Sequence, residues 1–154
     1  MGEIDARLAE LGIVLPRLAP PAGAYVPHIV VGEVLFVSGQ LPMLDGKIKY
    51  AGRIGDEVSL EQGYAAARLC ALNLLAHVRD ACEGTLSRVK RVVKLGGFVL
   101  CTSEFTQHPQ VVNGASDLMM EIFGETGRHT RIAVGAPALP LGAAVEVDGI
   151  FQIG

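Results

Sequence analysis

The chain has 154 residues, of which 50% are hydrophobic and 19% charged, and its formal net charge is -3. This length predicts one domain with a sizeable core, and no apolar run approaches the ~20 residues that a membrane-spanning helix needs. An acidic chain with 5% aromatic residues lacks the basic, aromatic surface typical of nucleic-acid binding. No signal-peptide pattern opens the sequence, so we expect a cytoplasmic protein with neither a nucleic-acid nor a membrane partner.

The first elements in chain order are a short helix, an extended segment and a hairpin. Apolar residues at helical spacing predict an amphipathic helix over residues 3–11. Residues 15–27 are rich in proline and glycine, which favours an extended lead-in without regular structure. Two apolar runs, 29–31 and 34–38, are separated by only two residues, so we expect them to pair as a hairpin.

The middle of the chain predicts a long helix followed by a long strand. Asp45-Gly46 indicates a turn before a short strand over 47–50. The segment Ser59–Gln62 is typical of a capping box and would start a helix that runs to about Glu83. Residues 89–100 become almost wholly apolar, as in a central strand.

The last elements complete a pattern of hairpin, helix, strand, helix and hairpin. A second helix is predicted over 106–123, with its proline confined to the first turn. Strands are predicted over 128–135 and 143–153, and we expect them to form the closing hairpin. This order favours one sheet beneath two helices.

The cysteines and histidines suggest neither a disulfide nor a metal site. Cys70 and Cys82 lie about 18 Å apart on one predicted helix, which is too far for a disulfide. We expect all three cysteines, Cys70, Cys82 and Cys101, to be buried free thiols. The histidines are scattered along the chain, so no metal ligation is expected.

Four segments resemble the RidA/YjgF family: PPAGAYVPHIVVGEVLFVSGQLP (20–42), GTLSRVKRVVKLGGFVL (84–100), QVVNGASDLMMEIFG (110–124) and ALPLGAAVEVDGIF (138–151). The resemblance implies a chorismate-mutase-like α+β fold with one mixed sheet and two helices on one face. It also implies a homotrimer around a central barrel, with ligand clefts between subunits. On this basis residues 1–19 are an N-terminal helical extension and residues 20–154 are the RidA-like domain.

The resemblance implies a reaction as well as a fold. Its best-understood members hydrolyse reactive enamine or imine intermediates to 2-oxo acids and ammonia, without metal or cofactor. The expected ligand is therefore a small carboxylate. Two alternatives stay open: a non-catalytic trimer that binds or senses a ligand, and, more distantly, a ribonuclease. The basic run 88–94 is the only positive patch that the latter could use, and a solvated strand face explains it as well.

Several residues match positions that line the family cleft. Tyr25 would reach into the cleft from the lead-in, although it also suits a packing aromatic. Ser38, Gly39 and Gln40 end a strand, where the Gly39 backbone would contact the ligand and Gln40 would support it. Asn113, early in the second helix, would lie near the cleft or be a solvated polar residue.

Glu146 matches the glutamate that orders the attacking water in the deaminases. In Val145–Asp148 the two acidic residues alternate with valines, which puts both carboxylates on one face of the strand. That face is either a solvent-facing acidic stripe or the wall of a cleft, where Glu146 would act as general base.

The segment GETGRHTRIAVG (124–135) departs from the family pattern. The family arginine that grips the substrate carboxylate is replaced here by His129, flanked by Arg128 and Arg131. Strand alternation would put Arg131 on the same face as His129, and Arg128 on the other. Three interpretations compete: Arg131 replaces the missing arginine with His129 as its partner, the cleft takes a different ligand, or the cluster is structural.

Overall fold

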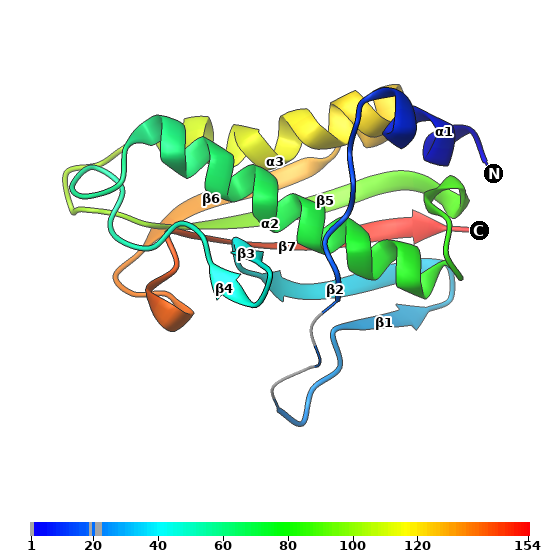
Figure 1. Cartoon of the computed structure of the whole chain (residues 1–154), viewed down its shortest axis with the longest axis horizontal. Coiled ribbons are helices and arrows are strands. Elements are labelled where there is room, and N and C mark those ends of the chain that lie inside the picture. Colours follow the sequence, from blue (N-terminus) through cyan, green and yellow to red (C-terminus); the bar gives the residue numbers. More distant parts are fainter. Residues whose placement is uncertain (1, 19, 21–22) are drawn as a thin grey trace.

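The computed structural model describes residues 2–18, 20 and 23–154. A five-stranded sheet in the order β1-β2-β7-β5-β6 forms its centre, and two long helices, α2 (Leu60–Ala81) and α3 (His108–Phe123), cover one face of it (Figure 1). The strands are β1 (His28–Val31), β2 (Val34–Gln40), β5 (Val89–Leu100), β6 (Thr130–Ala136) and β7 (Val145–Ile153). The expected α+β architecture, with one mixed sheet and two helices on one face, is confirmed.

Helix α2 begins where its capping box predicts. The Ser59 hydroxyl accepts a hydrogen bond from the Gln62 amide at 3.1 Å, and Gln62 Oε1 accepts one from the Ser59 amide at 2.9 Å. Both bonds satisfy backbone donors that the first turn leaves free. The helix ends at Ala81, two residues before the predicted Glu83, and Gly84 follows with a φ of +98°.

Helix α3 packs unusually close to α2. A Cβ added at Gly114 would lie 2.0 Å from the Tyr64 carbonyl oxygen and 3.2 Å from the Arg68 amide nitrogen, both in the α2 backbone. The two helix backbones therefore meet where only glycine fits. A second glycine, Gly97 in β5, lets the Val112 side chain of α3 approach the sheet, since a Cβ there would lie 2.5 Å from it.

The closing hairpin was predicted wrongly. Strands β6 and β7 do not pair, because β5 lies between them. Helix α3 crosses over from the end of β5 and returns the chain parallel to it, with Leu95 opposite Arg131. Strand β7 then enters antiparallel between β2 and β5, with Phe98 opposite Glu146. Strand β7 begins at Val145 and not at residue 143, because the two preceding residues pair with the segment 50–51: Ala143 bridges Ala51, and the Ala144 amide donates to the Tyr50 carbonyl at 3.0 Å.

The first hairpin is confirmed, and the second is shorter than predicted. Strands β1 and β2 pair with Val31 opposite Val34. The strand predicted over 47–50 is only β4 (Lys47–Ile48), paired with β3 (Met43–Leu44). Asn73 of α2, which is 9% exposed, donates to the carbonyls of residues 41 and 43 at 3.1 and 2.9 Å, and so fixes this hairpin to the helix.

Helix α1 (Glu3–Glu10) is anchored to the rest of the chain through Asp5. The Asp5 carboxylate accepts hydrogen bonds from the Thr85 hydroxyl, from the Leu86 amide at 3.2 Å and from the Ser87 hydroxyl at 3.1 Å. Partial burial raises the pKa of Asp5, but these bonds outweigh it and leave that pKa below its usual value. The predicted domain boundary after residue 19 falls on a residue outside the described part, whereas the described residues between 15 and 27 contain no helix or strand, as predicted.

We expect Asp5→Ala to lower the free energy of unfolding at pH 7 by about 1 kcal/mol, because the variant loses hydrogen bonds to a charged acceptor on a partly exposed site. The folded-state pKa is depressed, so this stabilisation is present above the unfolded pKa of about 3.9 and disappears as the pH falls through the folded value. Urea denaturation at pH 7 and pH 3 measures it, with exposed Glu3→Ala as the control. Equal stability of Asp5→Ala and the parent at pH 7 would contradict this anchor.

All three cysteines are free and buried, as predicted. Among the described helices, none combines the length and apolar character needed to cross a membrane.

Candidate functional site

A cluster of polar side chains joins β6 to α3 on the helix side of the sheet. Arg131 lies opposite Leu95, whose side chain is buried beneath the helices, so the guanidinium points to α3. Its Nη1 donates to Asn113 Oδ1 at 2.8 Å and to Ser116 Oγ at 3.1 Å. Arg131 and Asn113, both predicted from the sequence, are therefore in direct contact.

His129 belongs to the same cluster, although it lies outside the strand. Strand β6 begins at Thr130, two residues later than predicted. The imidazole Nδ1 lies 2.6 Å from the Gly127 carbonyl oxygen, and Nε2 lies 2.8 Å from Ser116 Oγ. A carbonyl oxygen only accepts, so Nδ1 carries a proton. Ser116 Oγ also accepts from Arg131, so this hydroxyl contacts both side chains.

Ser116 connects the cluster but was missed in the sequence analysis. It follows Asn113 by three positions in α3, which places both side chains on one face of the helix. That spacing was the available signal, but serine is too common on helix surfaces to be singled out. Its hydroxyl bridges Arg131 and His129.

Arg128 does not join the cluster. Its side chain is 69% exposed, and its Nε lies 3.3 Å from Glu125 Oε2. Arg128 therefore lies outside the Arg131 cluster, and nothing in one copy of the chain tests its predicted contact with a ligand.

The Arg131 guanidinium is half-buried without a carboxylate partner. Burial lowers the pKa of Arg131, and the nearby Asp117 carboxylate opposes this shift. Asp117 itself accepts a hydrogen bond from the Tyr64 hydroxyl at 2.7 Å. Within residues 2–18, 20 and 23–154, no salt bridge to Arg131 is present, and its Nε and Nη2 donate no hydrogen bond. A partly desolvated cation with free donors favours an anionic ligand.

Glu146 lies on the other face of the sheet, which we call the open face because neither α2 nor α3 covers it. The neighbouring Val145 and Val147 are fully buried on the helix side, so the predicted alternation is confirmed. A Cβ added at Gly39 would lie 3.0 Å from Glu146 Cδ, so the β2 backbone closely approaches this carboxylate. Burial raises the pKa of Glu146, and the Asp148 carboxylate raises it further.

The remaining predicted residues are placed near the Glu146 end or in solvent. The Ser38 hydroxyl donates to the Val26 carbonyl at 3.0 Å, and Gln40 Nε2 donates to the Ser38 carbonyl at 3.0 Å. Both side chains therefore shape the irregular end of β2. Tyr25 is 58% exposed and, among the described residues, makes no hydrogen bond to Arg131 or Glu146.

The candidate residues thus form two groups on opposite faces of one sheet. Arg131, Asn113, Ser116 and His129 gather on the helix side, and Glu146 lies beside Gly39 on the open face. One copy of the chain does not bring the two groups together. The described residues also contain no group of three or more histidine, cysteine, aspartate or glutamate side chains arranged to hold a metal ion.

Because the pKa of Glu146 is raised, we expect its replacement by the neutral isostere glutamine to increase the free energy of unfolding in a pH-dependent way. Because the folded-state pKa lies above the unfolded one, the contribution of this carboxyl to stability is complete below the unfolded pKa and lost as the pH rises through the folded pKa. Glu146→Gln should therefore be more stable than the parent at pH 7, by no more than about 1 kcal/mol at this half-exposed site, and equal to it near pH 3.5. Chemical denaturation at fixed protein concentration measures this. Glu33→Gln, in an exposed turn, should show no such trend.

Comparison with known proteins agrees with this fold. Residues 5–151 match the family model described as "YjgF/chorismate_mutase-like, putative endoribonuclease". The chain is 48% identical over 153 residues to Protein TCP17 of Trypanosoma cruzi, covering 99% of this chain and 95% of that one. It is 27% identical to the 2-iminobutanoate/2-iminopropanoate deaminase of Dermatophagoides farinae, covering 92% and 95%.

A solved structure has the same fold over almost the whole chain. The protein Atu1372 of Agrobacterium tumefaciens, whose function is unknown, superposes with a TM-score of 0.90 at 48% identity, covering 98% of this chain and 93% of that one. The family match spans far more than half of the sequence, and both relatives at 48% identity span nearly all of it. The chain belongs to the RidA/YjgF family of chorismate-mutase-like proteins.

Proposed function

We propose that this chain binds a small carboxylate in clefts between copies of itself and hydrolyses reactive enamines or imines to 2-oxo acids and ammonia. The observation that carries the proposal is the half-buried Arg131, which has free Nε and Nη2 donors and no carboxylate partner among the described residues. A planar guanidinium fits a substrate carboxylate through two parallel hydrogen bonds. The name of the Dermatophagoides farinae relative supports the same class of reaction.

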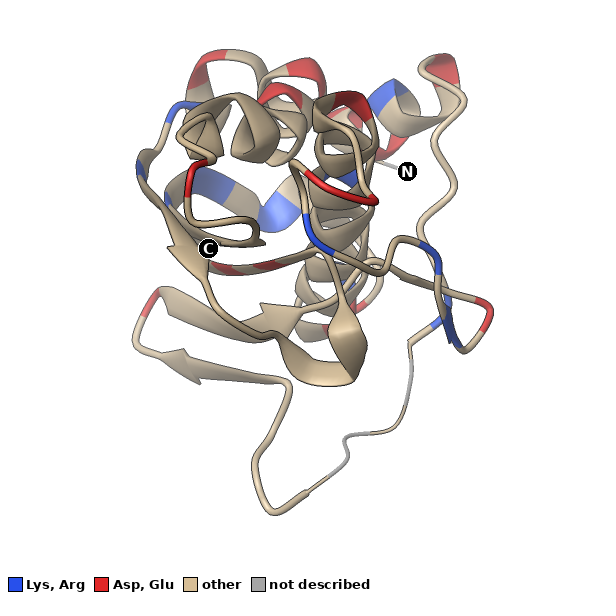
Figure 2. Ribbon diagram, turned by 90° about the vertical axis from the view of Figure 1, so that its left-hand side faces the viewer, with Lys and Arg blue, Asp and Glu red and all other residues tan. Residues whose placement is uncertain are grey.

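The separation of the two groups supports a site shared between subunits. Apolar side chains remain half-exposed on the open face, including Ile29 at 54%, Phe36 at 42% and Ile132 at 48%. Strands β1 and β2 contain no Lys, Arg, Asp or Glu, as their tan ribbons in Figure 2 show. Exposed apolar surface of this kind favours burial against a second copy. In a homotrimer, Arg131 of one subunit would then face Glu146 of its neighbour.

Each group would have a distinct role in the reaction. Arg131 would bind the carboxylate, while Asn113 and Ser116 hold its guanidinium in place and His129 holds Ser116. Glu146, with its raised pKa, would take a proton from water as the oxygen attacks the imine carbon. Glu146 passes this proton to the former imine nitrogen, which gives a carbinolamine. The carbinolamine loses ammonia when its hydroxyl proton moves to the nitrogen and the C–N bond breaks as the carbonyl forms, so one water is consumed for each ammonia released.

Hydrolysis of 2-iminopropanoate generated in situ by a serine dehydratase tests the proposal. The parent should accelerate pyruvate and ammonia release above the uncatalysed rate, and Glu146→Gln should lower kcat/KM by about 100-fold, within the range of general-base contributions. Arg128→Gln, which alters an exposed arginine outside the cluster, should leave the rate unchanged. An unchanged rate in Glu146→Gln would refute the assigned role of this carboxylate.

One observation favours a second function, a non-catalytic ligand-binding trimer. His129 stands where the family resemblance expects the arginine that grips the substrate, and its imidazole is occupied by Gly127 and Ser116. Stabilisation of the parent by pyruvate or 2-oxobutanoate, with no acceleration of imine hydrolysis, would support binding alone and exclude the deaminase.

A further inference from the structure

A pocket lies along helix α2, and none of the residues of the two groups described above lines it. It has a volume of about 560 Å³ and lies between α2, the segment 14–17 and the residues around the β3–β4 hairpin. This volume falls within the range of small-molecule sites. The segment that follows α1 crosses α2 here, as the blue trace in Figure 1 shows.

The walls of this pocket are fixed by bonds and packing. Leu15 is 6% exposed and anchors the crossing segment in the hydrophobic core. On the opposite wall, Asn73 holds the hairpin to α2 through the two hydrogen bonds described above. The Tyr50 carbonyl accepts from the Ala144 amide at 3.0 Å, which ties the end of the hairpin segment to the start of β7. Both walls are therefore preformed.

The pocket combines an apolar floor with a cationic rim. Leu69 and Leu72 of α2 line the pocket beside Leu15, and Leu69 is 8% exposed. Arg17, Lys49 and Arg68 contribute three positive charges, against one negative charge from Asp45.

The rim keeps two positive charges without a salt-bridge partner in the described part of the chain, and these would attract an anion. Arg68 is neutralised by Glu121, with Nη2 and Oε2 3.2 Å apart. Neither Arg17 nor Lys49 has a salt-bridge partner within the described part of the chain. Charge complementarity therefore favours an anionic head at the Arg17–Lys49 edge, above an apolar body on the leucines.

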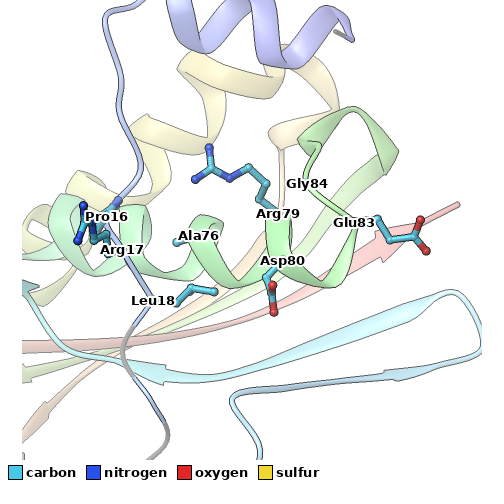
Figure 3. Close-up of a pocket in the computed structure, with 8 residues that line it drawn as sticks. All are labelled: Pro16, Arg17, Leu18, Ala76, Arg79, Asp80, Glu83 and Gly84. Atoms are coloured by element: carbon cyan, nitrogen blue, oxygen red, sulfur yellow. The ribbon is translucent and has the colours of Figure 1, made fainter.

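A neighbouring pocket lacks this excess of positive charge. It has a volume of about 290 Å³ and lies on the other side of Arg17, near the end of α2 (Figure 3). Its lining carries two positive charges, Arg17 and Arg79, and two negative charges, Asp80 and Glu83. The two carboxylates already have other partners, His28 at 3.1 Å and Arg88 at 3.9 Å respectively. Its balanced charges do not select for an anion.

We propose that the 560 Å³ pocket binds a small amphipathic carboxylate, with its apolar chain or ring on Leu15, Leu69 and Leu72 and its carboxylate between Arg17 and Lys49. This site is separate from the proposed intersubunit cleft and does not depend on its chemistry.

Titration calorimetry with octanoate tests the site. Octanoate should bind at least about tenfold more tightly than 1-octanol, which lacks the charge, or acetate, which lacks the chain. The double variant Arg17→Gln/Lys49→Gln should weaken octanoate binding about tenfold. Arg79→Gln, which alters the neighbouring pocket only, should bind within twofold of the parent (about 0.4 kcal/mol).

Two further variants test the site in other ways. The first blocks the pocket without changing any charge, and the second shows whether octanoate binds in the intersubunit cleft instead. Ala65→Phe should fill the pocket and abolish binding while all charges remain. Arg131→Gln should bind octanoate as the parent does. Loss of binding in Arg131→Gln with retention in Arg17→Gln/Lys49→Gln would overturn the proposal, as would equal affinity for octanoate and 1-octanol or no binding by the parent.

Discussion

Replacing Gly114 by alanine is expected to destabilise the protein by about 3 kcal/mol or more, because overpacking of this kind has no low-energy relief. The added Cβ would lie 2.0 Å from the Tyr64 carbonyl oxygen and 2.9 Å from its carbonyl carbon. Both atoms belong to the backbone of α2, which cannot rotate away as a side chain can. The two helices would have to separate, and the core between them would lose packing contacts.

Urea or thermal denaturation measures this effect at fixed protein concentration. Gln110→Ala is a matched control in the same helix, since that side chain is exposed and its loss should change the free energy of unfolding by less than about 0.5 kcal/mol. If Gly114→Ala proved as stable as Gln110→Ala, the described approach of the two helices would be wrong.

The second large effect is expected at Arg131. Arg131→Gln should weaken the binding of pyruvate, the product of the proposed reaction, by about 100-fold, since a charge-assisted hydrogen-bonded pair is worth about 2–5 kcal/mol when one partner is truncated. Arg131→Lys should recover only part of the affinity, because an ammonium group keeps the charge but not the planar fork.

Arg128→Gln is the matched control for this experiment. Its side chain is largely exposed and paired with Glu125, so pyruvate affinity should stay as in the parent. Ser116→Ala should produce a smaller loss than Arg131→Gln, because it frees the guanidinium without removing it. Equal losses in Arg128→Gln and Arg131→Gln would indicate a general electrostatic effect and contradict a specific Arg131 contact.

Local signals predicted the elements of this fold better than their pairing. The two-residue connection after Val31 and the capping box at Ser59 act within a few residues, and both predictions are confirmed. The pairing of β6 with β5, and not with β7, depends on the path of α3 over the sheet. No short-range pattern specifies that path, so adjacency in the sequence suggested a hairpin that does not exist.

In the candidate site, too, the sequence predicted local features but not the contacts between distant elements. Arg131 lies in β6 and contacts α3, whereas Arg128 lies before the strand and is largely exposed, so strand alternation does not apply to it. The bridging role of Ser116 required knowledge of how α3 lies over β6. The distance between Arg131 and Glu146 was also not evident from the sequence. Their strands, β6 and β7, are consecutive in the chain, but β5 lies between them in the sheet.

Mixing two inactive variants tests the central claim, a hydrolytic site shared between subunits, most directly. Arg131→Gln and Glu146→Gln proteins would be unfolded together, refolded as a mixture and assayed for 2-iminopropanoate hydrolysis. If each cleft takes Arg131 from one subunit and Glu146 from the next, random assembly restores about a quarter of the native clefts and of the parent's activity. Activity no higher than that of the separately refolded variants would contradict the shared site.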